Sequence, residues 1–263
     1  MGRILVQRSH DTRFAETLSG LDGMFDVVVA SDGELGNVIE RNRHQIDGAV
    51  LFHLTDASIR AVELLLNERF NAPTTPVAYL GRTSAGMRLP YATTYFDRTA
   101  GDSLVSFLST PRRIGVLVVE DDAGIRDVLK LSLSKHFVVD VAGDGAEALT
   151  RIRETVYDIV VLDVMLPVVS GDDVFRELRK TRPDTAVLII TAYDTEAREI
   201  DYVLGGADGY VAKPFDSNRA FRRKVIEALR HHHDRAVAAL HSREAEEADE
   251  AWGAYRQSMQ AHV

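Results

Sequence analysis

Residues 114–215 alternate strictly between short apolar runs and amphipathic segments, and this alternation restricts the fold more than any other feature. The apolar runs lie at 114–120, 137–142, 157–163, 185–191 and 208–213. Because the run at 114–120 is apolar throughout rather than at every second residue, it is typical of a parallel strand buried on both faces. Strands that alternate with helices in this way predict an α/β fold with a doubly wound, five-stranded parallel sheet.

Residues 1–110 repeat the same order of segments less regularly, which indicates an internal repeat. Strand-like runs lie at 3–9, 25–31, 46–54, 75–81 and 91–97, and a helical segment is expected at 57–70. The sequence Ser-Thr-Pro-Arg-Arg at 109–113 interrupts both patterns. We therefore predict two tandem flavodoxin-like domains with five-stranded parallel sheets, at residues 1–110 and 113–231.

The C-terminal part of the chain is expected to be helical from Asp216, which we predict as the N-cap. Residues 232–263 form a predicted helical extension whose apolar stripe is too thin to indicate a coiled coil. The three histidines at 231–233 could suggest a metal site. Consecutive helical residues point about 100° apart, so the three cannot converge on one ion, and we expect a solvent-facing helix.

The composition excludes several classes of protein. The chain has no cysteine, so neither disulfides nor thiolate metal sites hold the fold. Its net charge is −9, and residues 113–215 contribute most of it, with 19 acidic and 12 basic side chains. No part of the chain is basic, so nothing indicates nucleic-acid binding. Neither a signal peptide nor a membrane-spanning run is recognisable, and we expect a cytoplasmic protein without a membrane partner.

Polar side chains gather where the strands of the second domain end. Glu120 and Asp121 follow the first strand and Asp163 the third, while Thr191 and Lys213 follow the fourth and fifth. Ligands of open parallel sheets bind beyond these carboxyl ends, so the side chains should meet in one crevice. Three carboxylates repel one another, and a hard cation such as Mg²⁺ suits them. This set predicts phosphoryl transfer to Asp163.

Residues 114–231 resemble the receiver domain of two-component response regulators. The resemblance is carried by "VLVVEDD", "VVLDVMLPVVSG", "TA" at 191–192 and "YVAKPF", in that order. It implies that Asp163 receives phosphate from a histidine kinase and that Mg²⁺ is bound by Asp121, Asp163 and the backbone carbonyl of Met165, with Glu120 reaching it through water. It also implies that Thr191 and Lys213 contact the phosphate, that Tyr210 turns inward on activation, and that the Lys213–Pro214 bond is cis.

The first domain lacks these groups. When the two repeats are aligned, Gln7 and Arg8 fall opposite Glu120 and Asp121, Phe52 falls opposite Asp163, and Gly81 falls opposite Thr191. Residues 1–112 contain no lysine. We therefore interpret residues 1–110 as a degenerate pseudo-receiver that serves as a binding or dimerisation surface. Asp47, His53 and Asp56 are more simply turn or surface residues than catalytic ones.

The main functional hypothesis is a phosphorylation-dependent response regulator whose output is protein–protein interaction. Two alternatives stay open: a phosphorelay intermediate that passes phosphate to a histidine phosphotransfer protein, and a phosphate-independent scaffold. The expected partners are a histidine kinase or histidine phosphotransfer protein, a downstream protein, and a second copy bound through the tail or the receiver face. We expect no enzymatic activity beyond the domain's own phosphotransfer and dephosphorylation.

Overall fold

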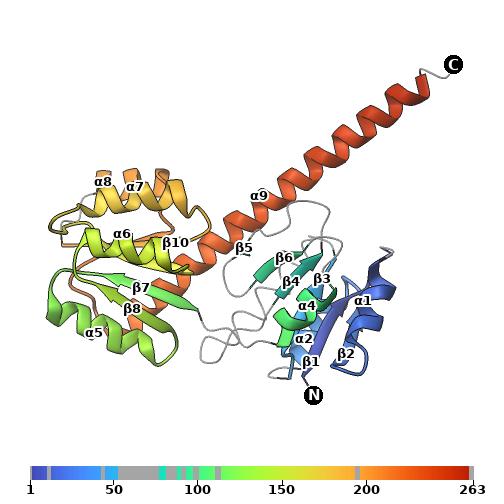
Figure 1. Ribbon diagram of the computed structural model, residues 1–263, viewed down its shortest axis with the longest axis horizontal. Helices are drawn as coiled ribbons and strands as arrows, with labels where there is room; N and C mark the ends of the chain where they lie inside the picture. Colours follow the sequence, from blue (N-terminus) through green and yellow to red (C-terminus); the bar gives the residue numbers. More distant parts are fainter. Residues whose placement is uncertain are drawn as a thin grey trace.

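The chain forms two α/β units and one long C-terminal helix in a computed structural model (Figure 1). The structure describes residues 2–10, 13–42, 45–52, 77–80, 88–89, 93–96, 101–109, 114–192 and 196–260. None of the helices in these ranges is long and apolar enough to cross a membrane.

The second unit has the predicted five-stranded parallel sheet, with strands in the order β8-β7-β9-β10-β11. Its strands are β7 (Gly115–Val119), β8 (Val138–Ala142), β9 (Ile159–Asp163), β10 (Ala186–Thr191) and β11 (Gly209–Ala212). Its helices are α5 (Ala123–Ser134), α6 (Gly145–Glu154), α7 (Gly171–Thr181), α8 (Glu196–Leu204) and α9 (Asn218–Gln260). The central strands β9 and β10 are buried along their whole length, as continuous apolar runs require.

Helices cover both faces of this sheet. Alternate strand residues such as Val118 and Leu188 pack under α5 and α9, whereas Leu117 and Val187 pack under α6, α7 and α8. Side-chain caps start α5, α6 and α7: Asp122 accepts the Ile125 N–H, and Asp144 and Ser170 cap their helices in the same way. Local signals thus agree with the tertiary packing throughout this unit.

The first unit contains a six-stranded sheet in the order β2-β1-β3-β4-β6-β5. Its strands are β1 (Arg3–Gln7), β2 (Asp26–Ala30), β3 (Gly48–Leu51), β4 (Val77–Leu80), β5 (Arg88–Leu89) and β6 (Thr93–Phe96); its described helices are α1 (Arg13–Leu21), α2 (Leu35–Arg41) and α4 (Gly101–Ser109). Five strands are parallel in the order seen in the second unit, which agrees with an internal repeat. The helix expected at 57–70 lies outside the described residues.

The prediction of five strands in the first unit was wrong by one. The sixth strand, β5, pairs antiparallel with β6 at the edge of the sheet. It is two residues long, and so short a strand has no hydrophobic period that a sequence could reveal.

The C-terminal helix α9 differs from the prediction in two respects, its cap and the burial of its histidines. It begins at Asn218 after a cap by Ser217, whose hydroxyl accepts the Ala220 N–H at 3.1 Å, so Asp216 is not the cap. Its continuity through 231–232 agrees with the predicted helix, because no Gly or Pro interrupts it there. His232 and His233 are 5% and 1% exposed, so the solvent-facing interpretation was wrong for both.

Candidate functional site

Three carboxylates meet at the carboxyl ends of β7 and β9. Glu120, Asp121 and Asp163 each place an oxygen within 4.8 Å of the others. Glu120 and Asp163 are buried, whereas Asp121 is exposed. Adjacent parallel strands bring these residues together as the sequence predicted, because β7 pairs directly with β9. The oxygen-only set fits a hard divalent cation with one side open to solvent.

The side chain of Lys213, which follows β11, extends to two of the carboxylates. Its ammonium donates to Glu120 Oε2 at 2.6 Å and also to Asp163 Oδ2. The Lys213 backbone N–H donates to the Thr191 carbonyl at 2.7 Å, which ties β11 to β10 just below the site. The Lys213–Pro214 bond is cis, as the resemblance implied.

Burial and ion pairing act in opposite directions on these groups. Burial raises the pKa of Glu120 above its usual value, although the Lys213 hydrogen bond opposes the shift. Burial lowers the pKa of Lys213, but its hydrogen bonds to Asp163 and Glu120 outweigh burial, so the net pKa is raised. Lys213 therefore stays cationic and offsets part of the repulsion among the carboxylates.

The loop after β9 holds Asp163 in place. The Met165 N–H donates to Asp163 Oδ1 at 2.9 Å, so the peptide of Met165 lies beside the carboxylate. Val168 takes a left-handed φ of 67°, and the Val169 N–H closes a tight turn on the Pro167 carbonyl at 2.8 Å. A β-branched residue rarely adopts this conformation, so the surrounding packing must impose it.

Two glycines clamp this loop. A Cβ on Gly171 would lie 2.2 Å from the Asp163 carbonyl oxygen and 2.6 Å from Val164 Cα. A Cβ on Gly145, at the start of α6, would lie 2.1 Å from the Val169 carbonyl oxygen. Only glycine permits backbone this close on both sides of the loop.

Gly171→Ala is expected to lower the free energy of unfolding by about 3 kcal/mol, because its Cβ would displace backbone rather than a flexible side chain. Urea denaturation followed by circular dichroism measures the change. Gly115→Ala is the matched control, since its Cβ meets its nearest neighbour at 3.8 Å, an ordinary contact. A Gly171→Ala variant as stable as that control would contradict the close approach.

Arg126 of α5 is a site residue that sequence reasoning missed. Its guanidinium donates to the carbonyl of Glu120 at 2.7 Å and to that of Asp121 at 3.1 Å. It thereby fixes the backbone that carries two of the three carboxylates. An arginine five residues after the acidic pair, within the following helix, was the available signal.

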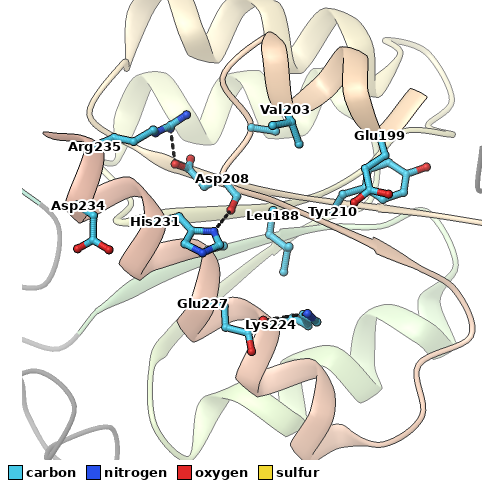
Figure 2. Close-up of a pocket in the computed structure, with 13 residues that line it drawn as sticks. Leu188, Glu199, Val203, Asp208, Tyr210, Lys224, Glu227, His231, Asp234 and Arg235 are labelled. Atoms are coloured by element: carbon cyan, nitrogen blue, oxygen red, sulfur yellow. Dashed lines mark hydrogen bonds and ion pairs between the residues drawn. The ribbon is translucent and has the colours of Figure 1, made fainter. Parts of the chain in front are cut away.

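The two predicted switch residues lie on neighbouring strands. Thr191 ends β10, is 1% exposed, and is in register with Ala212 of β11. Tyr210 is partly exposed, with its ring 6.1 Å from that of Tyr202, and lines a groove of about 500 Å³ between α8 and α9 (Figure 2). The ring of Tyr210 thus lies against α8 in the structure, outside the carboxylate cluster.

At the corresponding edge of the first sheet, the side-chain amide of Gln7 is buried. Gln7 is fully buried, donates to Asp32 Oδ1 at 2.5 Å, and accepts the Phe52 N–H at 2.7 Å. Phe52 is 4% exposed, and its ring packs edge-on against Phe14 at 5.7 Å. Apolar packing and a hydrogen-bonded amide therefore fill this edge of the first sheet.

The strand register corrects part of the predicted alignment by one residue. The Arg8 N–H donates to the Ala30 carbonyl just as the Glu120 N–H donates to the Ala142 carbonyl. Arg8 therefore lies opposite Glu120, and Gln7 lies opposite Val119. The slip arose because only the centre of the first strand is apolar, so its end is not defined by the pattern. The β1–β3 and β7–β9 registers keep Phe52 opposite Asp163.

The structure describes Asp47 among the other residues considered in the first domain. Asp47 accepts the Arg3 N–H at 2.9 Å, which is a structural contact at the other end of the sheet. His53, Asp56 and Gly81 lie outside the described residues.

Comparison with known proteins agrees with the geometry of the second unit. Residues 116–225 match the sequence profile of the response regulator receiver domain. Residues 116–225 are a response regulator receiver domain. This domain places its part of the chain in two-component signal transduction.

Curated relatives match about two fifths of this chain. Response regulator MprA from Mycobacterium sp. (strain KMS) is 43% identical over 103 residues, which is 39% of this chain and 45% of that protein. Response regulator MprA from Mycobacterium ulcerans (strain Agy99) is 42% identical over 103 residues, 39% of this chain and 44% of that protein. The chain thus spans less than half the length of these relatives.

Two solved structures match a similar share of the chain. A Francisella response regulator receiver domain is 34% identical, with a TM-score of 0.41, and the match covers 44% of this chain and 98% of that one. The response regulator TrrA from Thermotoga maritima is 34% identical with a TM-score of 0.39, at 44% and 98% coverage.

Proposed function

We propose that the receiver domain accepts a phosphoryl group on Asp163 and that this modification controls a protein–protein interaction. The observation that carries the proposal is the convergence of Glu120, Asp121 and Asp163 with Lys213 at one edge of the sheet. Three carboxylates gathered beside a buried ammonium are unusual as a purely structural feature. Burying these charges costs free energy unless a bound ion compensates them.

Asp121, Asp163 and the backbone carbonyl of Met165 would hold Mg²⁺, with Glu120 reaching it through water. The donor set supports this assignment, since its carboxylate oxygens lie within 4.8 Å of one another. When bound, Mg²⁺ would neutralise negative charge on the oxygens of the transferring phosphoryl group.

The residues of the chain would act by position and charge. An oxygen of Asp163 forms the new P–O bond while the P–N bond of a phosphohistidine donor breaks, and the released imidazole nitrogen takes a proton from water. The Lys213 ammonium, which now donates to Asp163, would instead contact a phosphoryl oxygen. The Thr191 hydroxyl would donate to another oxygen, and the space it leaves would admit Tyr210.

We further propose that residues 1–110 are a pseudo-receiver that binds a partner or a second copy rather than phosphate. The buried Phe52 supports this, because it stands opposite Asp163 and its side chain cannot accept a phosphoryl group. The proposed partners are a histidine kinase or histidine phosphotransfer protein, which supplies the phosphate, and a downstream protein, in a cytoplasmic setting.

Incubation of the full chain with acetyl phosphate, with and without Mg²⁺, tests the proposal. We expect intact-protein mass spectrometry to show one added phosphoryl group in the presence of Mg²⁺, and peptide mapping to place it on Asp163. Little labelling is expected in EDTA, since the carboxylates would then repel the donor. Label on another residue would overturn Asp163 as the acceptor. No label in folded protein with Mg²⁺ would leave a phosphate-independent scaffold as the function.

A further inference from the structure

Asp208, in the turn before β11, carries a carboxylate that phosphoryl transfer does not use. Its side chain is completely buried. Oδ2 accepts the Val187 N–H at 2.8 Å, within the sheet. Oδ1 faces α9, where it accepts hydrogen bonds from Arg235 and from His232 Nδ1, the latter at 3.0 Å (Figure 2 shows the Arg235 contact). An enclosed carboxylate needs such partners, so its position depends on α9.

Neighbouring residues of α9 bind the same turn through its backbone. His231 Nδ1 donates to the Asp208 carbonyl at 3.1 Å. Arg235 also donates to the Gly206 carbonyl at 3.3 Å, where the chain turns with a φ of 94°. One turn of α9, residues 231–235, therefore holds the whole connection from α8 to β11. We call Asp208, His232 and Arg235 the latch.

The two α9 residues of the latch lie beyond the part of the chain that matches the receiver profile. The match to the receiver profile ends at residue 225, six residues before the first α9 contact to this turn. Covering the sheet does not require these contacts, because Phe221, Val225 and Leu229 already pack α9 on β10 and β11. His231, His232 and Arg235 thus add polar contacts between α9 and the turn before β11, beyond the part of α9 that covers the sheet.

The latch also lies between the switch residue and the first domain. Asp208 precedes Tyr210 by two residues, and the two lie at opposite ends of the groove between α8 and α9 (Figure 2). Beyond the latch, α9 runs past the first sheet and contacts β5 (Figure 1). A movement of β11 therefore has a direct mechanical connection, through Asp208 and α9, to the other unit.

We propose that Asp208, His232 and Arg235 are a latch that fixes α9 on the receiver domain and transmits phosphorylation of Asp163, through β11, to α9 and the first domain. The transmission rests on the proposed function. In the arrangement described, both oxygens of Asp208 are engaged, so a displacement of β11 that accompanies the movement of Tyr210 lengthens these contacts. Phosphorylation therefore loosens α9.

Hydrogen–deuterium exchange of α9 tests the latch, with covalent phosphate counted by mass in each sample. The full chain is compared with Arg235→Gln before and after acetyl phosphate and Mg²⁺. Arg235 is half exposed, so its replacement should leave the fold intact. Arg223→Gln is the matched control, because it makes the same change at an exposed site three turns earlier in α9.

We expect Arg235→Gln to speed exchange of peptides within 229–242 roughly ten-fold, as loss of a hydrogen bond to a charged group predicts. Phosphorylation should speed exchange of the wild-type peptides at least three-fold, should do the same in Arg223→Gln, and should add nothing in Arg235→Gln.

Wild-type exchange rates in Arg235→Gln would overturn the latch, and phosphorylated wild type with unchanged α9 exchange would overturn the transmission. If the wild type takes up no phosphate, the proposed function fails and the transmission fails with it. The mass measurement separates that result from a phosphorylated chain whose α9 does not respond.

Discussion

Asp163→Asn is expected to take up no phosphate from acetyl phosphate under conditions that label the wild type fully. The substitution keeps the size of the side chain but replaces the oxygen nucleophile by an amide, which is a far weaker nucleophile. The fold should persist, because the Lys213 ammonium keeps its 2.6 Å hydrogen bond to Glu120. Intact-protein mass spectrometry after incubation with Mg²⁺ gives the labelled fraction.

Asp122→Asn is the matched control for this variant. Asp122 lies beside the carboxylate cluster but caps α5 by accepting the Ile125 N–H at 2.8 Å. Asparagine caps a helix about as well as aspartate, so both labelling and stability should be close to those of the wild type. Equal labelling of Asp163→Asn and wild type would mean that another residue accepts the phosphate.

Lys213→Met is expected to lower the free energy of unfolding of the metal-free protein by about 3 kcal/mol. The variant leaves Glu120 and Asp163, which are 1% and 3% exposed, without their shared cation. Loss of a positive charge at the transferring group should also slow phosphoryl uptake about 100-fold. Urea denaturation in EDTA and the time course of labelling measure the two effects. Lys130→Met, at an exposed position of α5, should change stability by less than about 0.5 kcal/mol.

The stability of Lys213→Met should depend on pH in a defined direction. Burial already raises the pKa of Glu120 in the folded protein, and removal of the Lys213 hydrogen bond raises it further. The folded state then binds more protons than the unfolded state between the ordinary and the raised pKa of Glu120. The variant should therefore lose stability as pH rises through this interval and recover it on acidification. A stability deficit that does not change with pH would rule out Glu120 as its cause.

Much of the receiver site could be predicted from sequence because its signals are local. Each site residue directly follows an apolar run, and a parallel sheet brings the ends of its strands to one edge. Arg126 was missed because it donates to backbone carbonyls, and its position in the helix after the acidic pair was only a weak signal of that contact. Tyr210 was correctly placed on the last strand, but only packing decides that its ring lies against Tyr202.

In the first domain, the sequence showed that the phosphorylation-site residues are missing, but it did not show which side chains fill that edge of the sheet. The missing lysine and the apolar Phe52 were apparent from residue types alone. The burial of Gln7 was not, because it depends on Asp32 and the Phe52 N–H, which come from two other loops. A glutamine at the end of a short strand has no local feature that tells whether it faces solvent or the interior.

The sequence by itself determined the alternating α/β architecture, the five-stranded receiver sheet and the residues of its acidic site. Continuous apolar runs and helical periodicity are properties of neighbouring residues, so they can be read before the chain is folded. Only the tertiary structure decided the edge strand β5, the closure by Gln7 and the burial of His232 on Asp208. Whereas β5 pairs with the nearby β6, the closure by Gln7 and the burial of His232 depend on contacts between residues distant in sequence. Such a contact forms only when packing of the sheet and helices has fixed which face of each element is enclosed.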